Sequence, residues 1–282
     1  MFTVAGGMDM GSVGQRAAGL DRGGDRSREW RLGASEVVGV AGLVLYNWWV
    51  VVPFVPGMLP SDNGFFSDIE ASGLPHAPLL QHLDLLSGTL LLAALALRGS
   101  LGRRYRGREW GWLVGFAMAA GLGGKFSYAC SSGLSAVCRA QERHLQLPLH
   151  HYVHMLSGVL EFATITTAVF LAVRRTRGQR TGSAIVYRNV LRLFTVAYPL
   201  LGLAYLTDRL GSFIEPVFFL SFTLVILTHL FQPGAEDEEI GAGLGRQRSS
   251  PSVAATPPWS DRPAAVAQAG GGQCVADNRP SV

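Results

Sequence analysis

Long apolar runs alternate with shorter polar connections along most of this chain. The runs are Val37–Val55, Leu79–Leu97, Trp110–Tyr128, His151–Val173, Val190–Leu206 and Glu215–Phe231. Each approaches the roughly 20 helical residues that cross a hydrocarbon core about 30 Å thick. Pro199 and Pro216 do not exclude the last two runs, because neighbouring helices can satisfy the carbonyl groups that a proline frees. The pattern predicts an all-α polytopic membrane protein whose six spans form a bundle.

The segments that flank this bundle have a different composition. Residues 1–34 are rich in Gly and Arg, whereas residues 232–282 combine an acidic run at Glu236–Glu239 with many Gly, Ser, Pro and Ala residues. Neither composition can bury an apolar core. We therefore expect two disordered tails on either side of one transmembrane domain at residues 35–231.

Basic residues alternate with the spans and predict an orientation. Five arginines precede the first span, five follow the second and five follow the fourth, whereas residues 56–78 contain no Lys or Arg. Because cytoplasmic loops carry the excess of Lys and Arg, we expect both termini in the cytoplasm and the protein in the plasma membrane. The net charge of +4 then indicates contact with anionic lipid at these loops, not with nucleic acid.

Two cysteines bound a short loop that this orientation places outside the cell. Cys130 and Cys138 begin and end the segment CSSGLSAVC, whereas Cys274 lies in the expected cytoplasmic tail. An oxidising exterior permits a disulfide between the first two, which would mainly fix the shape of the loop. Two free thiols that happen to lie near each other are the alternative.

One stretch of the chain occurs twice. PLLQHLDLLSGTL at residues 78–90 matches PLHHYVHMLSGVL at residues 148–160, and each copy opens with a proline suited to a first helical turn. Small residues such as Ser and Gly let transmembrane helices approach closely. We interpret the match as an internal two-helix repeat, and we expect Ser87–Gly88 and Ser157–Gly158 to mark the crossing of the second and fourth spans.

Polar side chains line one face of the fourth span. At about 100° per residue, one arc of this helix carries His150, His154, Ser157 and Glu161. A carboxylate as deep in the membrane as Glu161 is costly unless it is protonated, paired or facing a wet cavity. We therefore expect Glu161 to point into the bundle, with Asn47 or Lys125 as its partner.

The histidines of this face allow a metal site. His150 and His154 have the i, i+4 spacing that places two imidazoles on one helical face, and His82 or Asp84 of the second span could supply a further ligand. Zinc is the metal that such ligands favour, and an open coordination position would activate water. The sequence is therefore compatible with a zinc site formed by His150, His154 and Asp84.

The polar face could also serve without a metal. His154 and Glu161 could form a proton relay or a ligand gate that leads into the membrane. Alternatively, the histidines could have a structural role in which they hydrogen-bond only to loops and headgroups, with a neutral Glu161 bonded to Asn47. The zinc site, the relay and the structural role all remain open at this point.

Two segments resemble the bacterial and archaeal membrane-protein family known as domain of unknown function 998. They are Ser67–Gly88, SDIEASGLPHAPLLQHLDLLSG, and Tyr128–Gly158, in which the cysteine-bounded loop leads into a Leu-Pro-Leu-His-His step. The resemblance covers roughly residues 35–231 and implies a six-helix integral membrane protein of bacterial type. It implies no activity.

A fainter likeness is to the alkaline ceramidase and adiponectin-receptor type of lipid amidase, which also carries His, Asp and Ser at the mouths of helices. Those proteins have a histidine pair in the last span, where this chain offers only His229. We therefore expect a non-enzymatic membrane protein, such as a sensor, an accessory subunit or a small-solute conduit, with an outward-facing pocket of His, Asp and Glu. A metal-dependent hydrolase acting on a lipid-like substrate is the alternative.

Overall fold

The computed structural model describes residues 11–55, 58, 65–102, 105–207 and 211–232, and every regular element within them is a helix. The α-helices are α1 (Gly11–Tyr46), α2 (Ala77–Gly99), α3 (Trp110–Lys125), α4 (Ala136–Arg143), α5 (Leu149–Arg175), α6 (Gly182–Thr207) and α7 (Gly211–Leu230). Two 3₁₀ helices lie between α1 and α2, namely η1 (Trp48–Phe54) and η2 (Phe66–Glu70). The all-α fold predicted from the hydrophobic runs is confirmed.

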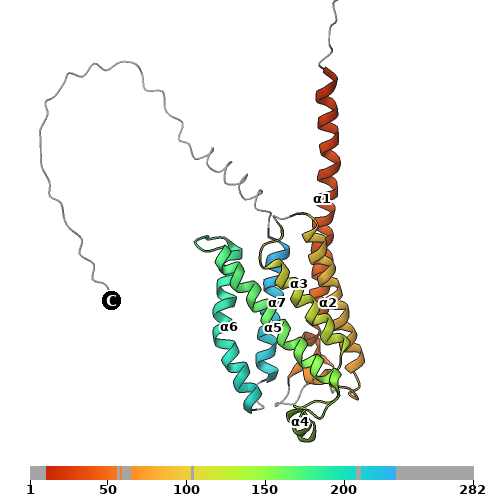
Figure 1. The fold of residues 1–282 in the computed structure, drawn as a ribbon, viewed down its shortest axis with the longest axis vertical. Helices are drawn as coiled ribbons and strands as arrows, with labels where there is room; N and C mark the ends of the chain where they lie inside the picture. Colours follow the sequence, from red (N-terminus) through yellow and green to blue (C-terminus); the bar gives the residue numbers. More distant parts are fainter. Residues whose placement is uncertain (1–10, 56–57, 59–64, 103–104, 208–210, 233–282) are drawn as a thin grey trace, which may run out of the picture. The chain divides into compact units, whose positions relative to one another are not determined.

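Six helices follow one another around the bundle (Figure 1). In this order α1, α2, α3, α5, α6 and α7 each contact the next helix, and α7 also contacts α1. Large apolar side chains fill the space between them, and Phe116, Phe218 and Phe222 are completely buried. The short helix α4 lies at the end of the bundle where α5 begins.

Within the described residues, five helical segments are long and apolar enough to cross a membrane. They are Arg26–Phe54, Ala77–Gly99, Leu149–Arg175, Gly182–Thr207 and Gly211–Leu230. Large apolar side chains on their outer faces, such as Val44 and Leu206, are exposed as lipid contact requires. The chain is therefore a multi-pass membrane protein.

Helix α3 corresponds to the third predicted span, but it is shorter than the other five. It ends at Lys125 after 16 residues, a length of about 24 Å at about 1.5 Å per residue. The prediction extended to Tyr128, whereas the backbone becomes extended at Phe126. Helix α3 lies between α2 and α5 and contacts both.

Helix α1 begins at Gly11, within the segment of residues 1–34 that was predicted to be disordered. Polar contacts hold part of this extension in place. The Arg28 guanidinium donates a hydrogen bond of 2.9 Å to the Tyr105 hydroxyl, and the Arg31 guanidinium donates one of 3.5 Å to Ser100 Oγ. Residues 233–282 of the second predicted tail lie outside the described residues.

Glycines bring α2 and α3 into backbone contact. A Cβ atom added to Gly88 would lie 2.4 Å from the backbone nitrogen of Gly121, and one added to Gly124 would lie 2.3 Å from the backbone nitrogen of Leu85. Real Cβ atoms do not approach other atoms so closely. Only glycine at both positions allows this approach, which agrees with the role of small residues in transmembrane packing.

The two Ser-Gly steps of the repeat therefore do not cross each other, and that prediction is wrong. Ser87 Oγ donates a hydrogen bond of 2.9 Å to the Gly42 carbonyl of α1. Ser157 faces α3 instead, because its Oγ lies 3.1 Å from the position that a Cβ of Gly123 would occupy. Helix α3 lies between α2 and α5, where it contacts Gly88 of the first copy and Ser157 of the second.

Candidate functional site

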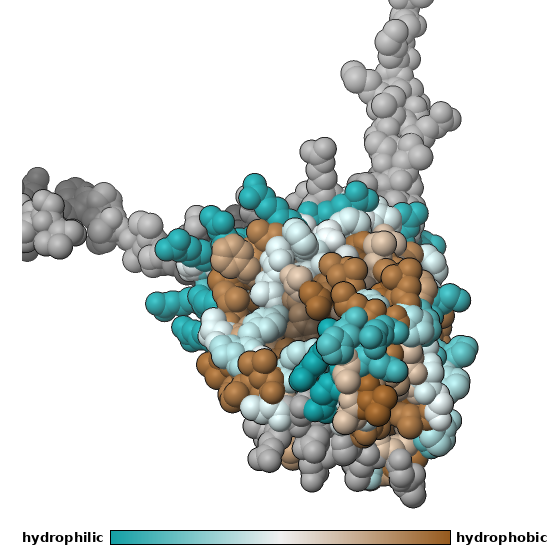
Figure 2. Space-filling view, turned by 60° about the horizontal axis from the view of Figure 1, so that its bottom comes forward, coloured by the Kyte–Doolittle hydropathy of each residue, from teal (hydrophilic) through white to brown (hydrophobic). Residues whose placement is uncertain are grey.

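A cavity of about 560 Å³ lies at the end of the bundle that carries η2 and α4. Six carboxyl groups line it, those of Asp68, Glu70, Asp84, Glu142, Glu161 and Glu215. The aromatic rings of the lining are those of Tyr46, Trp48, Phe65, Tyr128, Phe162, Tyr198, Tyr205 and Phe219. None of the described lining residues is Lys or Arg. Figure 2 turns this end toward the viewer and shows hydrophilic side chains gathered beside hydrophobic ones. The volume lies within the range of about 300–1,000 Å³ that small-molecule pockets occupy.

Asp68 holds two connections together at the cavity wall. Its Oδ1 accepts hydrogen bonds of 2.8 Å from Ser131 Oγ and 3.3 Å from the Gly133 nitrogen, and its Oδ2 accepts one of 2.9 Å from the Phe65 nitrogen. The side chain is buried. Both of its oxygen atoms are thus used to fix η2 against the cysteine-bounded loop.

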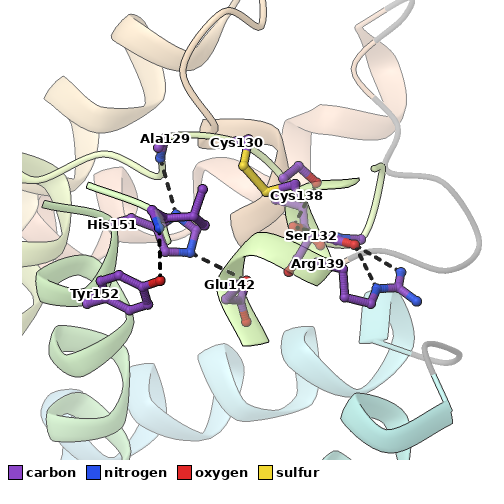
Figure 3. A network of polar contacts seen from close by, with 12 residues as sticks. Ala129, Cys130, Ser132, Cys138, Arg139, Glu142, His151 and Tyr152 are labelled. Atoms are coloured by element: carbon purple, nitrogen blue, oxygen red, sulfur yellow. Dashed lines mark hydrogen bonds and ion pairs between the residues drawn. A yellow bond between two sulfur atoms is a disulfide. The ribbon is translucent and has the colours of Figure 1, made fainter. Parts of the chain in front are cut away.

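Cross-links within this loop hold the partners of Asp68 in place (Figure 3). The sulfur atoms of Cys130 and Cys138 are 1.93 Å apart and form a disulfide. The Arg139 guanidinium of α4 reaches back to the Ser132 carbonyl with hydrogen bonds of 2.9 and 3.1 Å. The loop and α4 therefore behave as one cross-linked unit beside the cavity.

Glu142 of α4 is paired with a histidine that the sequence pattern did not single out. Its Oε2 lies 3.4 Å from Nε2 of His151, and its Oε1 accepts a hydrogen bond of 3.3 Å from the Tyr205 hydroxyl. The Ala129 nitrogen donates to Nδ1 of the same imidazole at 3.3 Å, so the ring proton belongs on Nε2, which faces Glu142 (Figure 3). His151 is fully buried and positions α4 against the start of α5.

Asp84 and Glu161 face the cavity, and each accepts a hydrogen bond from an aromatic side chain. Asp84 Oδ1 accepts a bond of 2.7 Å from the indole nitrogen of Trp48, and Glu161 Oε2 accepts one of 3.3 Å from the Tyr46 hydroxyl. Both donors lie at the end of the first span. Both carboxyl groups keep further acceptor capacity on the cavity side, because an ionised carboxylate offers about four lone-pair sites.

Glu70 and Glu215 complete the carboxyl cluster. The backbone nitrogen of Phe66 donates to the Glu215 carboxylate. Glu70 is only 3% exposed and shares a side-chain hydrogen bond with Asp84, and its Oε2 has no hydrogen-bond partner in the described part of the chain. Burial, together with the neighbouring carboxyl groups of Asp84, Glu215 and Glu161, raises the pKa of Glu70 well above its ordinary value.

His154 is held by backbone groups, and so is Ser157. The imidazole Nδ1 lies 3.0 Å from the Gly123 carbonyl and 2.6 Å from that of Phe126, so Nδ1 carries the ring proton and donates it. The ring also packs on Tyr128, with their centroids 3.9 Å apart. Ser157 Oγ donates its hydrogen bond to the His154 carbonyl at 2.6 Å. The Ser157 hydroxyl can therefore act toward the cavity only as an acceptor.

The structure brings four of the predicted site residues to the cavity and leaves three outside its lining. Asp84, His154, Ser157 and Glu161 line it, whereas His82, His150 and Asn47 do not. His82 is exposed and bonds through Nδ1 to the Pro78 carbonyl within its own helix.

The expected partners of Glu161 are both wrong. The Asn47 amide donates hydrogen bonds of 2.7 Å to the Leu43 carbonyl and 2.8 Å to Thr223 Oγ1, so it joins α1 to α7 instead. Lys125 is exposed at the end of α3. Glu161 takes its hydrogen bond from Tyr46, the residue before Asn47.

The described residues contain no group of three or more His, Cys, Asp or Glu side chains placed to hold a metal ion. The predicted zinc ligands His150, His154 and Asp84 do not form such a group.

Glu70 and Glu215 were not predicted as cavity residues. Glu215 had a signal, because a carboxyl group at the edge of an apolar run invites the same reasoning as Glu161. Glu70 lies in the segment Ser67–Gly88 that carries the family resemblance, but no helical periodicity places its side chain, since it reaches the cavity through the fold of the connection between α1 and α2.

A sequence model of the family described as "Protein of unknown function (DUF998)" matches residues 37–232. This match confirms the resemblance found in the sequence. No curated protein and no solved structure matches the chain.

Proposed function

This chain belongs to the family described as "Protein of unknown function (DUF998)", and we propose that it is a non-enzymatic plasma-membrane protein that binds a small solute from outside the cell. The observation that carries the proposal is the cavity of about 560 Å³ lined by carboxyl groups and aromatic rings. Large pockets with a few convergent polar groups are the usual form of a small-molecule site.

The arginine pattern supports an outward-facing cavity. Arg98 lies in the last turn of α2, and Arg174 and Arg175 in that of α5, whereas the cavity lies where α2 and α5 begin. Cytoplasmic ends of spans carry the excess of Lys and Arg. The cavity end of the bundle therefore faces outward, and the cysteine-bounded loop beside it lies in an oxidising compartment.

The metal-dependent hydrolase has no observation in its favour among the described residues. The predicted ligands are not assembled, and Ser157 is bonded to the backbone of its own helix. Binding without chemistry, as in a sensor or a solute conduit, accounts for the cavity more simply.

Filling the cavity tests the proposal. Gly158 lines the cavity, and no atom lies within 4 Å of the position that its Cβ would take. A Gly158→Trp variant should therefore fold and occupy the cavity. Gly111→Trp is the matched control, because Gly111 has equally open surroundings and does not line the cavity.

The full chain in lipid nanodiscs would be melted with a panel of small amines, carboxylates, sugars and neutral amides. We expect at least one class of solute to raise the melting temperature of the wild type and of Gly111→Trp but not of Gly158→Trp. The proposal fails if no class shifts the wild type, or if Gly158→Trp keeps the full shift.

A further inference from the structure

The carboxyl groups of the cavity divide into two sets that differ in how many of their oxygen atoms are already hydrogen-bonded. Asp68 and Glu142 use both of their oxygen atoms to bind the cysteine-bounded loop, η2, His151 and Tyr205. The second set consists of Glu70, Asp84, Glu161 and Glu215. Among these, Asp84 and Glu161 each accept one hydrogen bond from an aromatic side chain, and Glu70 Oε2 accepts none from the described residues. The second set therefore has acceptor atoms to offer a ligand.

Glu70 has the strongest need for a partner. It is 3% exposed and lies among three other carboxyl groups. Its carboxyl group shares a side-chain hydrogen bond with Asp84, which needs a proton between the two groups, and its Oε2 has no hydrogen-bond partner in the described residues. A buried carboxylate is stable only when it is paired or protonated. No described lining residue is a Lys or Arg that could pair with it, so the positive charge must come from a proton or from a ligand.

Aromatic rings stand directly beside these carboxyl groups. Trp48 donates a hydrogen bond to Asp84, and Tyr46 donates one to Glu161. Phe219 packs on Tyr46 with ring centroids 5.5 Å apart. Ring faces attract cations, and aromatic cages are the usual recognition site for organic ammonium groups. A compact metal ion fits less well, because no three carboxyl groups in the described part of the chain are grouped so that they could hold one.

We propose that the ligand of this cavity is a small organic cation, an amine or a quaternary ammonium compound, whose charged group lies against Glu70 and Asp84 and whose apolar part contacts Tyr46, Trp48 and Phe219. This inference rests on the proposed function, because it names the chemical class of the solute that the same cavity binds.

Titration of the full chain in nanodiscs by calorimetry tests the inference with three probes of similar shape. Benzyltrimethylammonium is the cation, benzyl alcohol is neutral and phenylacetate is the anion. We expect benzyltrimethylammonium to bind at least about tenfold more tightly than the other two, since one hydrogen-bonded or paired charge is worth about tenfold or more in affinity.

Two charge-removing variants locate the cation. Glu70→Gln and Asp84→Asn keep the shape of each side chain, and each should weaken benzyltrimethylammonium binding by about tenfold to a hundredfold. Glu29→Gln, at an exposed position of α1, should leave it unchanged. Melting curves of the variants without ligand show whether each is folded. If Glu70→Gln does not fold, Asp84→Asn alone tests the position of the cation.

The protons of the cluster supply an independent readout. Glu70 faces Asp84 of α2, Glu161 of α5 and Glu215 of α7, and its pKa is raised, so a bound cation should release a proton. Affinity for benzyltrimethylammonium should therefore rise with pH in the wild type and rise less in Glu70→Gln.

The outcomes separate this inference from the proposed function. Preferred binding of benzyl alcohol or phenylacetate would overturn the organic-cation inference while leaving a solute-binding cavity. Equal binding of the cation by Glu70→Gln, Asp84→Asn and the wild type would overturn it as well. If none of the three probes binds and the wider panel of solutes also gives no shift, both the inference and the proposed function fail.

Discussion

The contact between α2 and α3 predicts a large effect of one methyl group. In Gly88→Ala the new Cβ would lie 2.4 Å from the nitrogen and 2.6 Å from the Cα of Gly121, and 2.8 Å from the Ala117 carbonyl oxygen. All three are backbone atoms, so no side-chain rotation relieves the overlap. Ordinary contact begins at 3.4 Å, so the two helices must separate by about 1 Å.

The change in the free energy of unfolding caused by Gly88→Ala follows from two opposing effects. Overpacking a well-packed core costs about 1–3 kcal/mol, and a clash with backbone atoms belongs at the upper end of that range. Replacing Gly by Ala inside a helix returns about 0.8–1 kcal/mol. We expect Gly88→Ala to lower the free energy of unfolding by about 1–2 kcal/mol.

The repeat offers an internal control for this substitution. Gly158 follows Ser157 as Gly88 follows Ser87, but a Cβ at Gly158 meets no atom within 4 Å. Gly158→Ala should therefore keep or slightly raise the free energy of unfolding. Equilibrium unfolding in mixed micelles with increasing dodecyl sulfate, followed by tryptophan fluorescence, measures both variants. Equal stability of Gly88→Ala and Gly158→Ala would refute the α2–α3 backbone contact.

Three further predictions concern the connections around the cavity. Asp68→Asn should lower the free energy of unfolding by about 1.5–3 kcal/mol, because charge-assisted hydrogen bonds from the cysteine-bounded loop and η2 are weakened; an unchanged unfolding curve would contradict this role. Cys138→Ser should cost about 2–3 kcal/mol, since a short loop is no longer closed in the unfolded chain, and a reductant should destabilise the wild type but not this variant. Because the folded-state pKa of Glu70 is raised, the folded protein holds a proton that the unfolded chain releases above about pH 4.5. Stability should therefore fall as pH rises above that value and do so less in Glu70→Gln; parallel pH profiles of the two proteins would argue against a buried, protonated Glu70.

Hydrophobic runs were enough to predict the helices but not their neighbours. The predicted span at Leu79–Leu97 lies within α2, and that at His151–Val173 lies within α5, because about 20 apolar residues have few other solutions in a bilayer. Which helices meet depends on close approach in three dimensions. The Ser-Gly steps were recognised as packing sites, yet Gly88 and Ser157 contact α3, whose many glycines had been interpreted only as part of a span, and Gly158 faces open space.

The candidate site shows the same division. A carboxyl group deep in a span indicates a polar interior, so Glu161 was expected to face inward, and it lines the cavity. Its partner could not be deduced, since Tyr46 and Asn47 are adjacent in sequence and differ by about 100° around the helix. Glu70 comes from a 3₁₀ turn in a connection, and no periodic pattern predicts where such a turn will fold.

The central claim is that an acidic cavity opens to the outside of the cell beside Gly158. Its most direct test is the labelling of Gly158→Cys in intact cells with membrane-impermeant thiosulfonates that carry either a positive trimethylammonium or a negative sulfonate group. Ser72→Cys, in the exposed turn before α2, gives the reference rates for an open position at the same end. We predict that Gly158→Cys is labelled from outside. The ratio of the labelling rate with the cationic reagent to that with the anionic reagent should be at least about tenfold larger at position 158 than at position 72. Protection from both reagents, or a preference for the anionic one, would contradict this claim.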